Sequence, residues 1–251
     1  KRIELIADFR PAAALHHRLE IAQMVRDWPL AIAHSKRLER DCGERHGRDI
    51  AHFRCELAAA ALKQGTPEGR DAARHEIAAA IAADPEHPRP SLLAGELART
   101  EDDPEGAIAA WAPLVRKSPE FLALVAREWL AAHISVGRFD VGLAALERVQ
   151  AENPSVDTFA AIVDTLAHAR SQEEALAWAR SGLERQPSLL ALERLLALHA
   201  PLADEQRRGD IELMQRVVQP QARRLARRRG RTGGAARAAC RGARTRGRCA
   251  V

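Results

Sequence analysis

Two cysteines and two histidines near residue 50 are the side chains in this sequence whose types and spacing could support chemistry. They follow the pattern C-x3-H-x5-H-x2-C, as Cys42, His46, His52 and Cys55. Thiolates and imidazoles are ligands that Zn²⁺ accepts, but zinc sites usually gather their ligands in close pairs. Here the first two residues fall in an expected loop and Cys55 in an expected helix. We therefore predict no metal site, but a small buried thiol and solvated histidines.

A cysteine close to a histidine could also form a nucleophile and its base. No local signature surrounds these residues, and the chain has no G-x-x-x-x-G-K-[ST], G-x-G-x-x-G or H-E-x-x-H motif. Other histidines, such as His16, His17, His133 and His199, fall on expected helices, where we expect surface positions. We predict that the protein is not an enzyme and holds no cofactor.

The composition excludes β-sandwiches, barrels and a membrane span. The chain of 251 residues is 46% hydrophobic but only 4% aromatic, and strand-forming runs of Val, Ile and Thr are missing. Wholly apolar stretches such as Leu57 to Leu62 are far shorter than the roughly 18 residues that a transmembrane helix needs. The first residue is Lys1 and no signal peptide precedes the body. We expect that an N-terminal segment has been removed or lies upstream.

Excess positive charge is confined to the C-terminal segment. The net charge is +5, from 39 Lys and Arg against 34 Asp and Glu, and 12 of the arginines lie between Leu213 and Val251, where no acid occurs. Residues 1–212 therefore carry a net charge of −7, which disfavours contact with a phosphate backbone. The 4 cysteines are too sparse for a disulfide scaffold and indicate a reducing compartment.

A repeat of about 34 residues runs through the chain. Dipeptides that end in Pro recur with steps of 34, 35 and 33, at Asp84-Pro85, Ser118-Pro119, Asn153-Pro154 and Gln186-Pro187. Twelve residues before each Pro stands a small residue: Ala73, Ala107, Gly142 and Ala175. Small residues let two helices approach closely, and Pro ends a helix because it cannot donate the backbone hydrogen bond. Helix pairs repeated at this period are the tetratricopeptide (TPR) pattern.

The sequence therefore predicts an all-α protein, an α-solenoid of TPR-like helix–turn–helix repeats. Residues 1–46 are predicted as a degenerate first repeat, and residues 47–187 as four repeats ending near Pro85, Pro119, Pro154 and Pro187. Residues 188–226 are predicted as a terminal helix pair, and residues 227–251, rich in Arg, Gly and Ala, as a disordered tail. Because Pro113 stands inside a predicted helix, we expect a kink near Ala109 to Pro113.

The first helix of each TPR repeat lines a concave face, and solenoids most often bind their partners there. The charged residues that this register places on the face are Arg89, Glu96, Arg99, Arg127, Asp157, Asp164 and His168. We predict that they contact a partner protein. The alternative is a solvated face that binds nothing.

Several strings resemble the lipopolysaccharide assembly protein B (LapB) family. His52-Phe53-Arg54-Cys55-Glu56-Leu57-Ala58 is similar to its (F/Y)-x-C-E-L-A string. Further matches are Arg18-Leu19-Glu20-Ile21, Arg26-Asp27-Trp28, Ala31-Ile32, Arg89 to Gly95, Gly106 to Trp111, Asn153 to Val156 and Gln186 to Leu189. The ordered set covers about residues 15–226.

The resemblance implies a cytoplasmic TPR array between an N-terminal membrane anchor and a C-terminal rubredoxin-like zinc ribbon. It also implies an adaptor at the cytoplasmic face of the inner membrane. Such adaptors help the membrane protease FtsH degrade LpxC, the deacetylase that commits precursors to lipid A, and associate with envelope-assembly proteins.

Both ends of the chain depart from that pattern. The anchor is missing from this sequence, as expected if an N-terminal segment has been removed or lies upstream. An Arg-rich segment with single cysteines, Cys240 and Cys249, stands where the family has the C-x-x-C-G and C-P-x-C pairs that hold zinc. We expect no zinc site in this chain. We interpret the segment as an out-of-frame reading of a GC-rich ribbon-coding sequence, which is wrong if no shifted frame of the coding DNA encodes a C-x-x-C pair.

The sequence thus predicts a TPR adaptor that regulates lipopolysaccharide biosynthesis, with proteins rather than specific nucleic acids as partners. Two alternatives stay open. One is a generic TPR peptide-binding scaffold or co-chaperone. The other is an RNA-binding protein that acts through its Arg-rich tail, although that tail lacks the aromatic residues that stack on bases.

Overall fold

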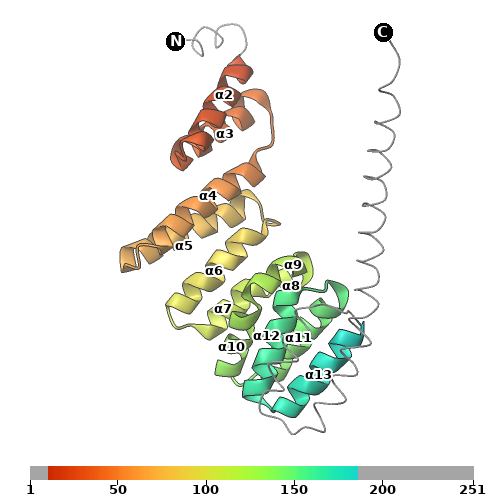
Figure 1. The fold of residues 1–251 in the computed structure, drawn as a ribbon. Helices are drawn as coiled ribbons and strands as arrows, with labels where there is room; N and C mark the ends of the chain where they lie inside the picture. The colour runs from red at the N-terminus through yellow and green to blue at the C-terminus, as the bar shows by residue number, and fades with distance from the viewer. Residues whose placement is uncertain (1–10, 186–251) are drawn as a thin grey trace, which may run out of the picture. The chain divides into compact units, whose positions relative to one another are not determined.

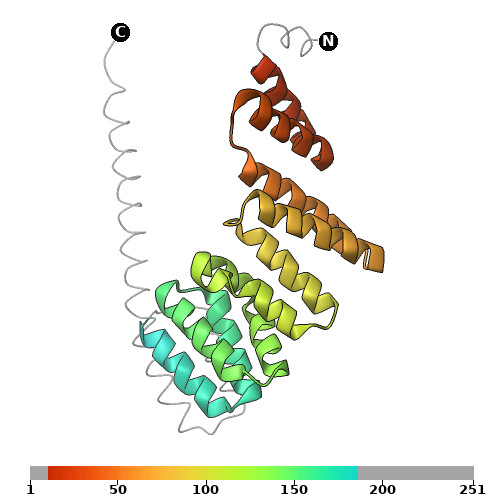
Figure 2. The same cartoon turned by 180° about the vertical axis from the view of Figure 1, so that it is seen from behind.

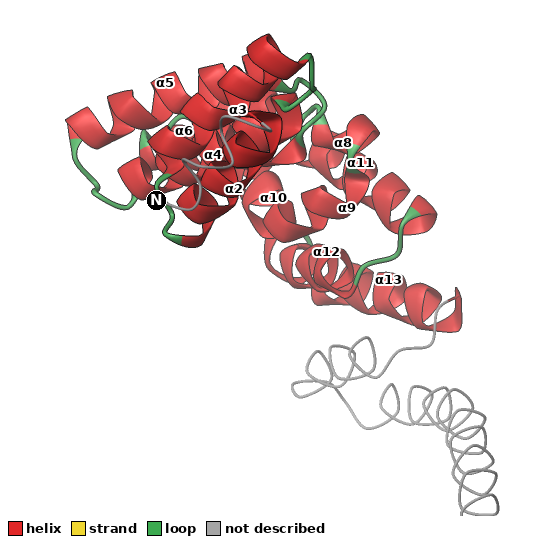
Figure 3. Ribbon diagram, turned by 90° about the horizontal axis from the view of Figure 1, so that it is seen from above, coloured by secondary structure: helices red, strands yellow, loops and turns green. Residues whose placement is uncertain are grey.

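The computed structural model describes residues 11–185, and every regular element in that range is a helix (Figures 1 and 3). The elements are α2 (Pro11–Met24), α3 (Trp28–Cys42), α4 (Gly47–Leu62), α5 (Pro67–Ala83), α6 (Pro88–Thr100), α7 (Pro104–Trp111), α8 (Leu114–Lys117), α9 (Pro119–Leu122), the 3₁₀ helix η1 (Ala123–Val125), α10 (Ala126–Ser135), α11 (Phe139–Glu152), α12 (Val156–Ala169) and α13 (Gln172–Arg185).

The longer helices follow one another as consecutive pairs: α2 with α3, α4 with α5, α6 with α7, α10 with α11, and α12 with α13. We call the first helix of each pair the A helix and the second the B helix. The predicted fold class, an all-α protein of TPR-like helix pairs, is confirmed for the described residues.

The described residues fall into two compact units, which meet in sequence between Ile162 and Val163. In the first unit, α3 packs on α4, α5 on α6 and α7 on α10, so successive hairpins lie side by side (Figure 2). In the second unit the described residues are 163–185, which form the end of α12 and all of α13.

The predicted boundaries of the repeats are not settled by this fold and stay predictions. Pro187, the predicted terminal helix pair at 188–226 and the predicted tail at 227–251 lie outside the described residues.

The turn between the A and B helices has the same backbone geometry in four hairpins. One residue in each turn adopts a positive φ, which is 58° at Arg26, 68° at Gly65, 57° at Asp102 and 69° at Gly137. Glycine adopts this left-handed conformation without the penalty that a Cβ brings. The turns at Arg26 and Asp102 are therefore held under more backbone strain than the two glycine turns.

The residue after the positive-φ position caps the B helix with its side chain. Each cap accepts the backbone N–H three residues further on, at 3.1 Å for Asp27, 3.0 Å for Thr66 and 2.8 Å for Asp103. Ser171 does the same for α13 at 3.1 Å. Such caps satisfy backbone donors that the first helical turn leaves without partners. The exception is Arg138, which begins α11 without a side-chain cap.

Proline sets where the B helices end. Asp84, Ser118 and Asn153 each precede a proline, and their φ angles are −148°, −154° and −133°. These non-helical conformations follow because the ring of Pro crowds the residue before it out of the helical region. Inside the third B helix, Pro113 interrupts the helix between α7 and α8, at the place where a kink is expected.

Apolar contacts join each hairpin to the next. Ala58 of α4, Ile77 of α5 and Leu97 of α6 form one buried cluster. Leu93 of α6 also packs against a second cluster that contains Cys55 of α4 and is built from α4 and α5. The A helix of one hairpin therefore covers apolar surface that the preceding hairpin cannot bury by itself.

In two neighbouring hairpins a glycine lies close to a tryptophan where the two helices pack, and in the first of them it makes room for the ring. A Cβ on Gly95 of α6 would overlap the indole of Trp111 of α7, which is 1% exposed. The sizes are exchanged in the next hairpin, where Trp129 stands on the A helix and Gly142 on the B helix. There the indole Nε1 of Trp129 donates to the carbonyl of Gly142 at 3.0 Å.

His133 corrects the expectation that the histidines lie at the surface. It is 3% exposed, and its ring packs against Trp129 with 4.6 Å between the ring centroids. Gly142 provides the space, because a Cβ there would overlap the imidazole. Neither ring nitrogen of His133 has a hydrogen-bonding partner among the described residues. Burial, the largest influence, lowers the pKa of His133 below its ordinary value of 6.5.

We expect Gly95→Ala to destabilise the protein, although a Gly-to-Ala change on a solvent-exposed helix face usually stabilises a protein. Better helix propensity contributes roughly 0.8–1 kcal/mol, whereas overpacking costs about 1–3 kcal/mol, and the buried Trp111 ring cannot move aside. The midpoint of urea unfolding should therefore fall. In the Trp111→Leu background the same change should cost nothing or stabilise. A rise in the midpoint of the single variant would contradict the close approach seen here.

We expect His133 to make the protein less stable in acid. Below its ordinary pKa of 6.5 the unfolded chain takes up a proton that the buried ring does not, so the free energy of unfolding falls as the pH falls. Urea midpoints of wild type and His133→Leu, measured from about pH 8 to about pH 5, should diverge, with wild type losing more. The exposed His75→Leu serves as the control. If the urea midpoints of wild type and His133→Leu change with pH in parallel, His133 is not the cause of the loss of stability in acid.

Candidate functional site

The seven residues predicted to contact a partner all lie on A helices. Those of the first unit are Arg89, Glu96 and Arg99 on α6, Arg127 on α10 and Asp157 on α12. Asp164 and His168 belong to the second unit, on the last turns of α12. Arg99, Arg127, Asp157 and His168 are exposed, while Arg89, Glu96 and Asp164 are half-buried. That these residues bind a partner stays a prediction.

Arg89 is held by the neighbouring A helix. Its Nη1 lies 2.5 Å from Oε1 of Glu56 on α4 and 3.3 Å from Nδ1 of His52 on the same helix. Because a guanidinium can only donate, Nδ1 of His52 accepts and the ring proton stands on Nε2. Arg89 therefore connects the A helices of two successive hairpins.

Glu96 and Arg99 form a pair within α6. Nε of Arg99 donates to Oε2 of Glu96 at 2.9 Å, and Nη2 donates to Oε1 at 2.6 Å. This hydrogen bonding is the main cause that raises the pKa of Arg99, and the carboxylate of Glu128 on α10 adds to it. Half of the Arg99 side chain, 53%, stays exposed. A two-point bond to one carboxylate leaves further guanidinium donors for a second acceptor.

The remaining predicted residues also make contacts. The backbone N–H of Asp157 donates to Oγ of Ser155 at 3.2 Å, in the first turn of α12, where a carboxylate is favoured by the helix dipole. In the second unit, Nδ1 of His168 donates to the carbonyl of Asp164 at 2.6 Å. Arg127 and Asp164 have contacts of their own.

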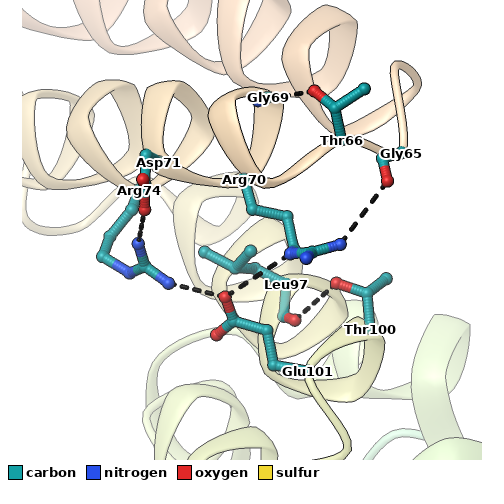
Figure 4. A network of polar contacts seen from close by, with 9 residues as sticks. All are labelled: Gly65, Thr66, Gly69, Arg70, Asp71, Arg74, Leu97, Thr100 and Glu101. Atoms are coloured by element: carbon teal, nitrogen blue, oxygen red, sulfur yellow. Dashed lines mark hydrogen bonds and ion pairs between the residues drawn. The ribbon is translucent and has the colours of Figure 1, made fainter.

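A second set of ion pairs joins hairpins through the A–B turns. Figure 4 shows that Glu101, at the end of α6, meets two arginines of α5. Its Oε1 lies 2.6 Å from Nη2 of Arg74 and 4.0 Å from Nε of Arg70. Arg74 also forms a hydrogen bond with Asp71, and this bond is the largest of the causes that raise the pKa of Arg74. Nη1 of Arg70 donates to the carbonyl of Gly65 at 3.5 Å. These charges fix one hairpin against the next.

Residues that pair with the predicted face were missed, although the repeat contains a signal for them. His52 and Glu56 contact Arg89, and the charge of Glu128 acts on Arg99, yet the register singles out only the two arginines. Opposite charges about one period apart recur as ion pairs, at 2.5 Å for Glu86 with Lys117 and 2.7 Å for Glu105 with Arg138. Because successive hairpins lie side by side, a search for opposite charges at this spacing would have found these pairs.

The cysteine and histidine group near residue 50 is spread over different surroundings. Cys42 is exposed at the end of α3, whereas Cys55 is fully buried in α4. Burial, the largest influence, raises the pKa of the Cys55 thiol to about 11, so at neutral pH it is not a thiolate nucleophile. His52 contacts Arg89, and His46, 9% exposed rather than solvated, contacts carboxylates. Within residues 11–185, no three or more His, Cys, Asp or Glu side chains are arranged to hold a metal ion.

None of the helices in the described part of the chain combines the length and the apolar composition that crossing a bilayer requires.

Comparisons with known proteins find the LapB resemblance independently. The lipopolysaccharide assembly protein B of Escherichia coli strain K12, and those of E. coli O6:H1 and O157:H7, are each 24% identical to this chain over 200 residues. The match covers 80% of this chain and 50% of each relative. Among solved structures, a thermophilic TPR protein of Thermus thermophilus is 16% identical, with a TM-score of 0.42 over 73% of this chain and 98% of that one. No family model matches the chain.

The chain is therefore a distant relative of LapB in its TPR portion. It spans about half the length of the curated relatives that it matches.

The two arginines of α6 should differ in their contribution to stability. Arg89→Gln should lower the free energy of unfolding by about 1 kcal/mol, because it leaves the half-buried Glu56 carboxylate without its partner. Arg99→Gln should change it by less than about 0.5 kcal/mol, since its pair is an exposed contact within one helix. Urea unfolding of the two variants under identical conditions measures both values. Equal losses would show that both arginines support the fold.

Proposed function

We propose that this chain is the TPR part of an adaptor that regulates lipopolysaccharide biosynthesis at the cytoplasmic face of the inner membrane, by presenting LpxC to the membrane protease FtsH. The observation that carries the proposal is the match to LapB over 200 residues, 80% of this chain. The relatives' name assigns them to lipopolysaccharide assembly. The roles of LpxC and FtsH come from the family that the sequence resembles.

The A helices of this fold supply charges for recognising proteins. The charge of Arg89 is taken up by the contacts between hairpins, whereas Arg99 and Arg127 are exposed on α6 and α10. An adaptor that holds a substrate and a protease together raises the local concentration of the substrate at the protease. Such a role needs binding surfaces and no catalytic residues, so the proposed function is not enzymatic.

Double charge reversal tests this proposal. Arg99→Glu with Arg127→Glu, made in the full chain, should lower capture of LpxC from a Gram-negative lysate by roughly tenfold, because like charges placed against each other in an interface disfavour binding. The matched control is Arg116→Glu with Arg148→Glu, exposed arginines of α8 and α11. Quantitative mass spectrometry measures LpxC and FtsH, and circular dichroism checks that helicity is kept.

Each result of that experiment has a distinct meaning. If the double variant Arg99→Glu with Arg127→Glu captures as much LpxC as wild type, these two arginines do not belong to the binding site. If neither LpxC nor FtsH is enriched by the wild-type chain, the proposed role is wrong and a generic TPR scaffold or co-chaperone becomes the better interpretation. RNA captured in a salt-dependent way, and lost on deletion of residues 227–251, would instead favour RNA binding through the Arg-rich tail.

A further inference from the structure

His46 is the one buried histidine of the described residues whose ring meets acidic groups on both sides. It caps the start of α4, and 11% of its side chain is exposed. Nδ1 lies 3.0 Å from Oδ2 of Asp49, one turn into α4. Nε2 lies 3.0 Å from Oε2 of Glu44 in the turn that follows α3. Both distances are those of hydrogen bonds to a carboxylate.

These two contacts decide the protonation state of the ring. A neutral imidazole carries one N–H, so its other nitrogen would point a lone pair at a carboxylate, which also has only lone pairs to offer. Only an imidazolium donates from both nitrogens. Each such bond joins two charged groups and is stronger than a bond between neutral groups.

We infer that His46 is an imidazolium in the folded protein, and that its charge forms a latch which ties α2 and α3 to the start of α4 and opens when the ring loses its proton at higher pH. The carboxylate of Glu44, in the turn after α3, links His46 to α2. Its second oxygen, Oε1, lies 3.0 Å from Nε2 of His16, in the middle of that helix. The backbone N–H of His46 adds a bond to α3, donating to Oε1 of Glu39 at 3.1 Å.

The charged and titratable groups that face His46 come from every element around it. They are Glu44 from the turn, Asp49 from α4, Glu39 from α3 and His16 from α2, whose ring centroid lies 6.1 Å from that of His46. Three of the four are carboxylates. This surrounding favours a positive charge on the ring.

The direction of the pH dependence follows from the same contacts. Burial is the largest single influence and lowers the pKa of His46, but the bonds from Asp49 and Glu44 together outweigh it and raise the pKa above its ordinary value of 6.5. The bond from His46, and then that from His16, lowers the pKa of Glu44 below its ordinary 4.5.

A raised histidine pKa stabilises the fold fully below pH 6.5, and this stabilisation is lost as the pH climbs through the folded pKa. A lowered glutamate pKa stabilises above pH 4.5 and is lost as the pH falls through the folded pKa. The latch is therefore complete between these two values. His133 responds in the opposite direction, because its burial disfavours the charged ring. Acid should tighten the first hairpin while it loosens the pair α10 and α11.

Two measurements on the full chain test the latch. Long-range proton–nitrogen spectra of the ¹⁵N-histidine-labelled protein should show both ring nitrogens of His46 protonated at about pH 6.5, with a midpoint above that of the same residue in urea. Hydrogen exchange should show α2 opening roughly tenfold faster at about pH 8.5 than at about pH 6, after correction for intrinsic rates, the size expected for one charge-assisted hydrogen bond.

Variants separate the charge from the packing. Glu44→Gln and Asp49→Asn keep the shape of each partner but remove its charge, and each should flatten the pH dependence of α2 exchange. His46→Gln should do the same, while His75→Gln, at an exposed site on α5, should leave it as in wild type. A singly protonated ring at about pH 6 would overturn the proposal. The proposal would also be overturned if hydrogen exchange of α2 changed with pH only as the intrinsic exchange rate does, in wild type and in Glu44→Gln alike.

Discussion

The structure depends on apolar contact between successive hairpins. A single helix pair buries the side on which its two helices meet but leaves a second apolar side open, and Ala58 and Ile77 belong to that second side of α4 and α5. Leu97 of the following A helix closes it. Each hairpin is thus completed by its neighbour, and stability belongs to the stack rather than to any one repeat.

This constraint explains why so many charges of the chain have structural roles. Arg74, Arg89 and Arg138 each reach a carboxylate on another hairpin, at distances of 2.6, 2.5 and 2.7 Å. These pairs are partly exposed, so each contributes about 1 kcal/mol or less, and they add directional contacts between hairpins to the apolar ones. Arg99, by contrast, is paired inside its own helix, and its charge can be redirected toward a partner without loosening the stack.

The sequence predicted the fold well because its signals are local and periodic. The prolines after Asp84, Ser118 and Asn153 mark helix ends by a steric rule that needs no tertiary context. The small residues mark helix crossings for a similar reason. The distant relation to LapB, first indicated by strings such as Phe53 to Ala58, was confirmed by a match over 200 residues.

What the sequence did not show is the partner of each polar side chain. Burial of His133 depends on Gly142 standing opposite on another helix, and no pattern within either helix reveals that. The sequence places His46 in a loop and predicts a solvated ring, because the carboxylates that enclose it come from a turn and from α4, and only the fold brings them together. The repeat register predicts which residues share a face, but it does not reveal the contacts that hold Arg89.

The exchange of tryptophan and glycine between two neighbouring hairpins bears on how a chain of look-alike parts avoids mispairing. If α10 were to take α7 as its partner at the same crossing, Trp129 and Trp111 would compete for one space. If α6 took α11 as its partner, Gly95 would leave unfilled the space that Trp129 occupies beside the carbonyl of Gly142. Both exchanges should cost stability, one through collision and the other through a cavity, so the placement of the two rings disfavours exchange of partners between these hairpins.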